Sequence, residues 1–246
     1  MSRTTRAITI ASLAALALAC GGGTTPADNT APRATPSTAT APAAPGGSFG
    51  DWSTSELQGA LVANGWTVTE CYSYTDEGIR DDECSAKKGN QWAEIDIDRY
   101  DTRKDALWMA EDAQGVAIDG KSVLDVTVYN GDEAEKILGA VLPKGAKITE
   151  VKADTVVGHL EKGGYSIIEK SMSTSDGYTY NNVEGEKAAR SYVSIDWEYV
   201  PGSSTADEDR ELDGGYASVY QGDDNDLSIY VYDYKAANEL VKTLVK

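Results

Sequence analysis

Hydrophobic and polar residues alternate along two segments, 91–99 and 191–199, and this period of two predicts a β-strand in each. Shorter stretches rich in β-branched and aromatic residues predict further strands at 66–72, 116–118, 123–129, 165–170, 216–220 and 227–234. One face of each strand is therefore expected to be buried and the other face to be open.

Apolar residues spaced three or four positions apart predict helices that flank these strands. A first helix is expected to begin after a cap at Ser53 or Thr54 and to end at Gly65. Another helix is expected at 102–114, whereas 201–215 is a weak helix former and is expected to be a loop. The residues expected to face inward on the helices are Leu57, Leu61 and Val62; Ala106, Met109, Ala110 and Ala113; Ile137, Leu138, Val141 and Leu142; Val156, Val157 and Leu160; Leu240, Val241, Leu244 and Val245.

Three blocks of sequence recur in order at a nearly constant offset, which predicts an internal repeat. LVANGWTVTEC at 61–71 matches LEKGGYSIIEK at 160–170, QWAEIDIDRYD at 91–101 matches SYVSIDWEYVP at 191–201, and VLDVTVYNGDEAEKILGAVL at 123–142 matches DLSIYVYDYKAANELVKTLV at 226–245. We therefore expect an α+β fold of two tandem copies, 50–142 and 143–246. Each copy is expected to be an α-β-β-(α)-β-β-α unit, an antiparallel four-stranded sheet with helices on one face, closed by its own final helix.

The N-terminus has a short apolar segment that follows two positive charges. Arg3 and Arg6 precede an apolar run at 7–19 that is too short to span a bilayer and ends at Cys20. This segment, 1–19, resembles the signal peptide of bacterial lipoproteins. The resemblance implies that the signal is removed, that Cys20 is acylated with chains such as palmitate, and that membrane lipid is a partner. Gly21 after the cysteine implies the outer membrane of a two-membrane bacterium.

The same segment leaves an alternative open. Lipoproteins usually have Leu where this chain has Ala17, and Ala17-Leu18-Ala19 also fits an ordinary A-x-A cleavage site. Cleavage there would release a soluble secreted or periplasmic protein. Residues 20–49 follow as the acylated cysteine and a Gly/Thr/Pro/Ala tether, whose composition predicts a flexible chain that holds the body away from the membrane.

The charge excludes several classes of function. Lys+Arg 22 against Asp+Glu 40 leaves a formal charge of -18, so no nucleic-acid partner is expected, because phosphate binding requires a basic surface. The chain has a single His and no dinucleotide or phosphate-binding loop, so no cofactor is expected. The tether's two charges cancel, so the acid lies on the body.

Two cysteines, Cys71 and Cys84, remain in the body. In an oxidising compartment such a pair, placed on either side of a Gly/Asp-rich excursion, predicts a structural disulfide. It would close a loop of about 14 residues and support the excursion, with about 3 kcal/mol of stabilisation. Lys170 stands in the place of Cys71 in the second copy, which is therefore expected to fold without this bond.

The open strand faces carry the candidate chemistry. Glu94, Asp96 and Asp98 alternate with the apolar residues of 91–99, and Asp96 and Asp98 are candidate ligands for a hard cation such as Ca²⁺. Tyr230, Tyr232 and Tyr234 are candidate ligand-binding residues, because tyrosine both stacks and hydrogen-bonds. The alternative is that these faces are solvated or pack against each other.

No nucleophile, base or metal motif stands in the structural context that catalysis needs, so no catalytic residue is assigned. The sequence favours a membrane-anchored lipoprotein of the cell envelope that binds or scaffolds an envelope protein or glycan without catalysis. Two alternatives are a secreted hydrolase that uses paired carboxylates and a Ca²⁺-stabilised acidic binding module.

Overall fold

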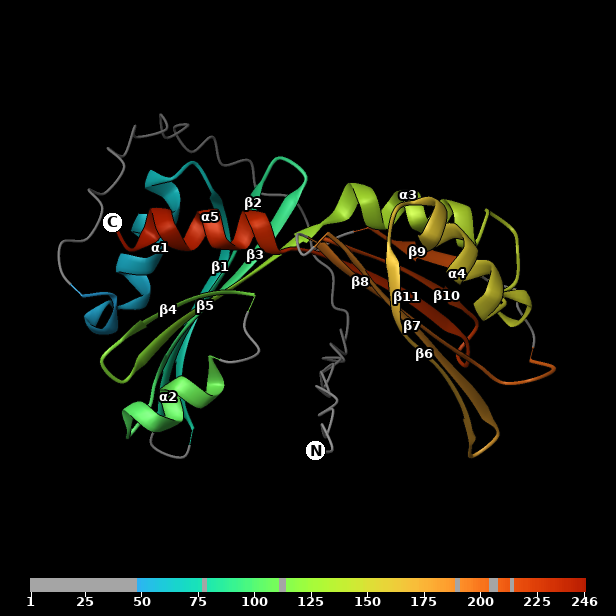
Figure 1. Cartoon of the computed structure of the whole chain (residues 1–246), viewed down its shortest axis with the longest axis horizontal. Coiled ribbons are helices and arrows are strands. Elements are labelled where there is room, and N and C mark those ends of the chain that lie inside the picture. Colours follow the sequence, from blue (N-terminus) through green and yellow to red (C-terminus); the bar gives the residue numbers. More distant parts are fainter. Residues whose placement is uncertain (1–47, 77–78, 111–113, 189–190, 204–207, 213–214) are drawn as a thin grey trace, which may run out of the picture. The chain divides into compact units, whose positions relative to one another are not determined.

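The computed structural model describes residues 48–246, apart from 77–78, 111–113, 189–190, 204–207 and 213–214. The predicted signal peptide, Cys20 and almost all of the tether lie outside the described residues. The described chain is a mixed fold of five α-helices and one antiparallel sheet of eleven strands (Figure 1). We call residues 48–142 the N-terminal half and residues 143–246 the C-terminal half.

The two halves contain similar elements in a similar order. The N-terminal half contains a 3₁₀ turn (Phe49–Asp51), α1 (Thr54–Ala63), β1 (Thr67–Asp76), β2 (Ile79–Lys88), β3 (Gln91–Arg99), α2 (Arg103–Met109), β4 (Gly115–Asp119), β5 (Ser122–Asn130) and α3 (Gly131–Val141). The C-terminal half contains a 3₁₀ turn (Ile148–Glu150), α4 (Ala153–Lys162), β6 (Ser166–Ser175), β7 (Tyr178–Lys187), β8 (Ser191–Tyr199), β9 (Glu208–Glu211), β10 (Tyr216–Gln221), β11 (Asp226–Asp233) and α5 (Tyr234–Leu244).

Helix α1 begins and ends as its sequence predicts. Ser53 and Glu56 form a reciprocal capping box, in which the Ser53 hydroxyl accepts from the Glu56 N–H and the Glu56 carboxylate accepts from the Ser53 N–H. Gly65 follows the helix with a φ of 79°, a left-handed conformation that favours glycine. Leu57 and Leu61 are buried, but Val62, which was expected to face inward, is 38% exposed.

The prediction of two four-stranded sheets was wrong. The strands form one continuous sheet in the order β1-β2-β3-β5-β11-β8-β7-β6, with β4 on β5 and β10 and β9 beyond β11. Strands β2 and β7 were not predicted, and each of them pairs with a neighbouring strand on both sides. Strands β5 and β11 join the halves where Tyr129 is opposite Tyr232. These non-local pairings leave no mark in local alternation.

The buried faces of the strands agree with the predicted alternation, and they belong to two separate apolar cores. The predicted inward residues of the long strands are all buried: Ala93, Ile95 and Ile97; Leu124, Val126 and Val128; Val193, Ile195 and Trp197; Leu227, Ile229 and Val231. The first core lies against β2, β3 and β5, and the second lies against β7, β8, β10 and β11. Alternation alone therefore identified the core side of these strands.

The final helices of the two halves are exchanged, which corrects the expectation that each copy is closed by its own helix. Helix α5 at the C-terminus places Ala237, Leu240, Val241 and Leu244 in the core of the N-terminal half. Helix α3 places Ala134, Ile137, Leu138 and Val141 in the core of the C-terminal half. The close approach of α5 to β4 is visible at Gly115, where an added Cβ would lie 2.7 Å from the Ala237 carbonyl carbon. The boundary between 142 and 143 therefore does not separate the two cores.

Helix α2 also departs from expectation. It spans Arg103–Met109 instead of 102–114, and it lies at the far end of the strands from α1 and α5 (Figure 1). Ala106 is fully buried, whereas Met109, expected to face inward, is 46% exposed. Ala113 lies outside the described residues. The predicted loop at 201–215 contains the short strand β9, where the N-terminal half has α2, so the two halves differ here. Because α2 contributes to neither apolar core, the helices do not all cover one face of the sheet.

The predicted disulfide is present, but its setting differs from the expectation. Cys71 and Cys84 are directly opposite each other on the paired strands β1 and β2, with a Cα–Cα distance of 4.2 Å. The described residues of the excursion that the bond was expected to support belong to the end of β1, as far as Asp76, and to the start of β2, from Ile79. The corresponding pair on β6 and β7 is Lys170 opposite Val183, and the Lys170 ammonium binds the Asp154 carboxylate at 2.5 Å. The C-terminal half thus makes the same pairing without a covalent bond.

We expect reduction of this disulfide to lower the free energy of unfolding by about 3 kcal/mol, because an open chain of that length gains conformational entropy when it unfolds. Strand β1 is an edge strand that pairs only with β2, and among the described residues the bond is the one disulfide that cross-links it to the sheet. Urea unfolding with and without dithiothreitol measures the effect. Equal midpoints would contradict a stabilising role.

A buried ion pair attaches the first described residues to the sheet. The Asp82 carboxylate has no exposed surface and accepts from Arg99 Nη1 at 2.5 Å and from Thr54 Oγ1 at 2.6 Å. Arg99 also donates to the backbone carbonyl of Gly50 at 2.8 Å and to that of Trp52. One guanidinium thus joins β3, β2 and the segment that enters the body from the tether.

Candidate functional site

The sheet face opposite the two cores is the candidate functional site, and we call it the open face. Strand register assigns each side chain to this face or to the core face, because side chains alternate along a strand. Its carboxylates on the six strands β2, β3, β5, β7, β8 and β11 include Asp81, Glu83, Glu94, Asp96, Asp98, Asp125, Glu184, Glu186, Asp196, Glu198 and Asp226. Within the described strands, Lys87 is the only basic residue in an open-face position, and its ammonium lies over the Trp92 ring.

Carboxylates of the N-terminal half are directly opposite one another across neighbouring strands. Glu83 on β2, Asp96 on β3 and Asp125 on β5 form one row, and Asp81 and Asp98 form the next. Like charges in directly opposite positions destabilise a sheet. In the C-terminal half, Asp196 accepts hydrogen bonds from Asn182 at 2.9 Å and from Ser194 at 2.9 Å. Glu198 is nevertheless directly opposite Asp226, and burial followed by the charge of Glu198 raises the pKa of Asp226 to about 6, so opposed carboxylates occur in both halves.

These carboxyls resist ionisation. Burial, followed by the charges of Glu83, Asp98, Asp125 and Glu94, raises the pKa of Asp96 to about 8. Burial and a hydrogen bond with Asp81 raise the pKa of Asp98 to about 7. Burial raises the pKa of Asp125 to about 6, and one of its oxygens is buried without a hydrogen-bond partner. Near neutral pH the open face is therefore under electrostatic strain.

We expect the free energy of unfolding to increase as the pH falls from 8 to about 5. The folded-state pKa values of Asp96, Asp98 and Asp125 are raised above their unfolded values, so the folded state binds more protons throughout this window. Asp96→Asn should stabilise the protein at pH 8 by on the order of 1–2 kcal/mol and flatten the dependence. Urea titrations at pH 5, 6.5 and 8 measure both effects, and a stability that rises with pH would contradict the prediction.

The predicted cation ligands are neighbours, but no cation cage surrounds them. Asp96 and Asp98 face the same side of β3, two positions apart. Among the described residues, no group of three or more His, Cys, Asp or Glu side chains is placed to hold a metal ion. Opposed carboxylates on a flat sheet lack the convergent oxygen ligands that Ca²⁺ requires. The arrangement is better suited to a partner that offers several spaced positive charges.

The predicted tyrosines belong to a larger aromatic cluster where the halves meet. Tyr232 contacts Tyr129 at 5.2 Å, Tyr192 at 5.6 Å and Tyr230 at 6.4 Å between ring centroids. Tyr234, the first residue of α5, contacts Tyr192 at 6.5 Å. Sequence reasoning found the three tyrosines near the C-terminus but missed the other two, because the pairing of β5 with β11 brings Tyr129 to the cluster. The Tyr129 hydroxyl donates to Glu94 at 2.8 Å, which links the cluster to the acidic rows.

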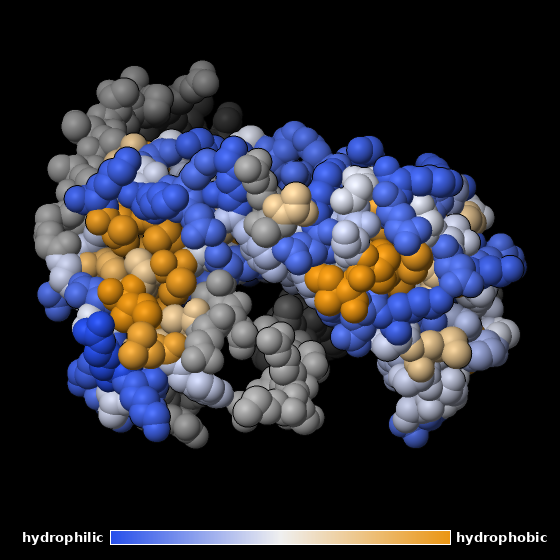
Figure 2. Space-filling view, viewed as in Figure 1, coloured by the Kyte–Doolittle hydropathy of each residue, from blue (hydrophilic) through white to orange (hydrophobic). Residues whose placement is uncertain are grey.

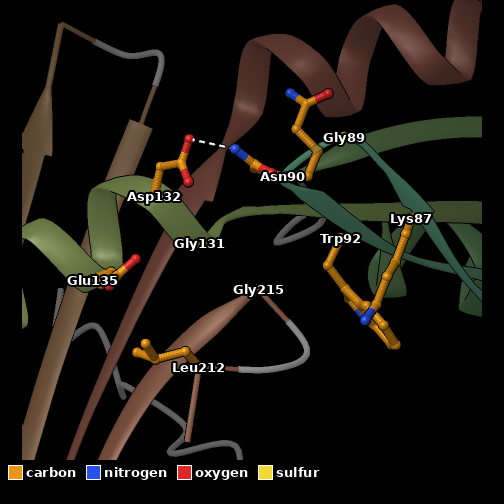
Figure 3. Close-up of a pocket in the computed structure, with 10 residues that line it drawn as sticks. Lys87, Gly89, Asn90, Trp92, Gly131, Asp132, Glu135, Leu212 and Gly215 are labelled. Carbon is orange, nitrogen blue, oxygen red and sulfur yellow. Dashed lines mark hydrogen bonds between the residues drawn. The ribbon is translucent and has the colours of Figure 1, made fainter.

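Two cavities lie near this junction, and neither includes the acidic rows. The first, about 280 Å³, is lined mainly by polar residues of the β2–β3 turn and of α3, and Figure 3 shows Asn90 donating to Asp132 at 2.8 Å beside it. Gly215 closes one side with a φ of 81°, and a Cβ there would lie 2.6 Å from the Cβ of Tyr129. The second cavity, about 390 Å³, adjoins Tyr165 and Lys187. The raised carboxyl pKa values therefore belong to a sheet surface outside both cavities.

No protein-family model matches this chain, and no curated protein or solved structure has significant similarity to it. The open face must therefore be interpreted from its own chemistry. No helix in the described residues has the length and apolar character needed to cross a bilayer.

Proposed function

We propose that this protein is a non-catalytic, lipid-anchored protein of the cell envelope whose open face binds a basic segment of a partner protein. The observation that carries this proposal is the pair of acidic rows, Glu83–Asp96–Asp125 and Asp81–Asp98, in which carboxylates oppose one another without a base between them. Lysine or arginine side chains spaced along an extended segment would neutralise these rows and lower the raised pKa values.

The aromatic residues beside the rows support the same kind of partner. Tyr72 and Tyr74 on β1 stack with ring centroids 5.9 Å apart, and Tyr72 donates to Glu83. Both rings are substantially exposed, at 43% and 48%. A guanidinium or ammonium group can bind a carboxylate and at the same time lie over a tyrosine ring. The open face therefore offers both charge and aromatic contacts to a cation.

A carboxylate-based hydrolase is the second candidate, because Asp81 and Asp98 share a hydrogen bond and Asp98 has a raised pKa. Hydrolases bind their substrate in a concave site. Neither of the two described cavities is lined by these carboxyls. The position of the pair outside both cavities favours binding over catalysis.

Binding is tested with a fluorescein-labelled ten-residue peptide of alternating Lys and Ser, with an alternating Glu-Ser peptide as the control. We expect the basic peptide to bind the open face, the acidic peptide not to bind, and the affinity to fall steeply as salt is added. Asp96→Asn/Asp125→Asn should weaken binding about tenfold, which corresponds to roughly 1.4 kcal/mol. Fluorescence anisotropy measures the dissociation constants.

A matched variant separates a defined site from general attraction to an acidic protein. Glu161→Gln/Asp154→Asn also replaces two carboxyl groups by amides, but on the exposed surface of α4, which packs on the core side. We expect this variant to bind within twofold of the unmodified protein. Equal weakening in both variants, or no binding of the basic peptide at low salt, would refute the proposed site. Because Asp96→Asn is expected to stabilise the fold, weaker binding could not be attributed to unfolding.

Lipid anchoring rests on the likeness of residues 1–20 to lipoprotein signal peptides. With Cys20 acylated and the signal peptide removed, the tether would hold the acidic body at the membrane surface, with the outer membrane as the proposed location. Metabolic labelling with an alkyne analogue of palmitate should label the unmodified protein and not Cys20→Ser. Absence of label would favour the soluble, secreted or periplasmic form.

We further propose that the body arose by duplication of one unit. Strands β1, β2 and β3 have the same lengths as β6, β7 and β8, and the first strand of each set has a register shift at the corresponding place, between Val68 and Glu70 and between Ile167 and Glu169. The exchange of α3 and α5 is the arrangement that a homodimer with swapped helices would leave after fusion of its two chains.

A further inference from the structure

We propose that helix α2 is a second membrane-contact site, which inserts Leu107, Trp108 and Met109 into the interface of a phospholipid bilayer. The inference rests on the proposed lipid anchor at Cys20, and it adds a contact that determines how the body is oriented on the membrane. Its basis is three consecutive large apolar residues on the surface, exposed by 47%, 55% and 46%.

The packing of α2 holds these side chains outward. Ala106 is the one residue of the helix that is fully buried, and the helix contacts β5 without joining either of the two apolar cores. The Thr102 hydroxyl caps the helix by accepting from the Asp105 N–H at 3.2 Å. Figure 2 shows apolar surface gathered over β4 and the adjoining end of α2. The exposed triplet is therefore a property of a folded, capped helix.

Trp108 distinguishes this patch from ordinary apolar exposure. The chain has five tryptophans, and three of them, Trp52, Trp66 and Trp197, are at most 6% exposed. Trp92 is intermediate, which leaves Trp108 as the most exposed indole. Tryptophan is enriched at the level of lipid headgroups, because its ring is apolar and its N–H is polar. Leucine and methionine beside it supply the apolar area that interfacial binding requires.

The tether enters the body at the same end of the molecule. Ser48, the first described residue, donates to Asp119 at the end of β4. Lys121, in the β4–β5 turn, accepts at its carbonyl from the Tyr100 N–H and donates from its ammonium to the Asp101 carbonyl, each at 3.0 Å. Helix α2 begins two residues later. The point where the lipid-anchored segment arrives is thus joined by hydrogen bonds to the base of α2.

The short sequence distance to the proposed anchor favours a bilayer as the occupant, and the local charge favours a zwitterionic one. About 28 residues separate Cys20 from Ser48, so an acyl chain on Cys20 would keep the body near the bilayer. Around α2 the exposed bases Arg103, Lys104 and Lys121 stand against Asp101, Asp105 and Asp119, and Glu111 and Asp112 follow the helix in the sequence. This end therefore carries a small net negative charge, and both it and the open face would be repelled by anionic lipid. A zwitterionic surface fits it best.

The test uses the mature chain, residues 20–246, carrying Cys20→Ser so that no acyl chain contributes. With phosphatidylcholine vesicles we expect co-sedimentation and a blue shift of tryptophan emission, together with quenching when the lipid is brominated near the headgroup. Leu107→Ser/Trp108→Ser should weaken partitioning at least tenfold. The matched control, Met172→Ser, removes a 73% exposed methionine from β6 and should leave partitioning unchanged.

A folded Cys20→Ser chain that neither sediments with vesicles nor is quenched by brominated lipid would overturn the proposal. Equal loss in the Met172→Ser control would overturn it as well, because the contact would then not be specific to α2. Circular dichroism confirms that each variant is folded. Palmitate labelling of the unmodified protein reports separately on the lipid anchor, so failure of the anchor and failure of the α2 contact give different results.

Discussion

Replacement of Asp82 by alanine is expected to lower the free energy of unfolding by about 3–5 kcal/mol. Asp82 is fully buried, and its removal would leave the Arg99 guanidinium, whose side chain is only 18% exposed, without its carboxylate partner. Thr54 would lose its acceptor, and the segment at Gly50 and Trp52 would lose a rigid attachment to β3. Urea unfolding, followed by tryptophan fluorescence and circular dichroism, measures the loss.

The control for this prediction is Asp154→Ala. Asp154 binds Lys170 at the same distance of 2.5 Å at which Asp82 binds Arg99, but its side chain is 90% exposed. An exposed ion pair is worth between 0 and about 1 kcal/mol, so a small loss is expected. If the two variants lose similar stability, the buried cluster does not hold the entering segment as the geometry indicates.

The second large effect concerns the exchanged helices. Leu240→Ala in α5 and Leu138→Ala in α3 each remove a buried leucine and should each lower the free energy of unfolding by about 2–5 kcal/mol. The two variants should also differ in which segments show faster amide exchange, and this difference is the more specific prediction. Because α5 packs in the core of the N-terminal half, Leu240→Ala should increase native-state amide exchange in α1 and β3, whereas Leu138→Ala should increase it in α4 and β8.

Hydrogen exchange followed by mass spectrometry resolves these segments in one experiment, and the two variants control for each other. Each is a Leu→Ala change at a nearly fully buried helical position, so the two differ mainly in the core that they open. Faster exchange of α4 and β8 in Leu240→Ala would contradict the helix exchange. The same result would show that each half is closed by its own helix.

The sequence predicted much of the local structure for direct physical reasons. Alternation at 91–99 and 191–199 identified both strands and their buried side chains, because the period of a strand is two and one face is apolar. Ser53 and Gly65 located the ends of α1 through a capping box and a left-handed glycine. The positions of Cys71 and Cys84 on either side of an acidic excursion predicted their disulfide, given the oxidising compartment that residues 1–19 lead us to expect.

The sequence patterns did not predict the strands that are rich in polar residues. Strand β2, with the sequence IRDDECSAKK, looks like an acidic loop, and only its pairing on both sides with β1 and β3 makes it a strand. Opposed carboxylates cost stability, so no propensity argument would place them in a sheet centre. The sequence therefore did not predict the acidic rows, which form across β2, β3 and β5. It did identify Asp96 and Asp98 as candidate residues on β3.

The sequence by itself determined the local periods, the ends of α1, the disulfide pair and the acidic character of the body, because each depends on neighbouring residues or on composition. The tertiary structure alone decided which core receives α3 and which receives α5, since the apolar period of a helix does not specify the core that it meets. It also paired β5 with β11 at Tyr129 and Tyr232, which makes the sheet continuous. Strand pairing likewise placed Asp96 directly opposite Glu83 and Asp125. These features depend on contacts between residues distant in the chain, which local patterns do not encode.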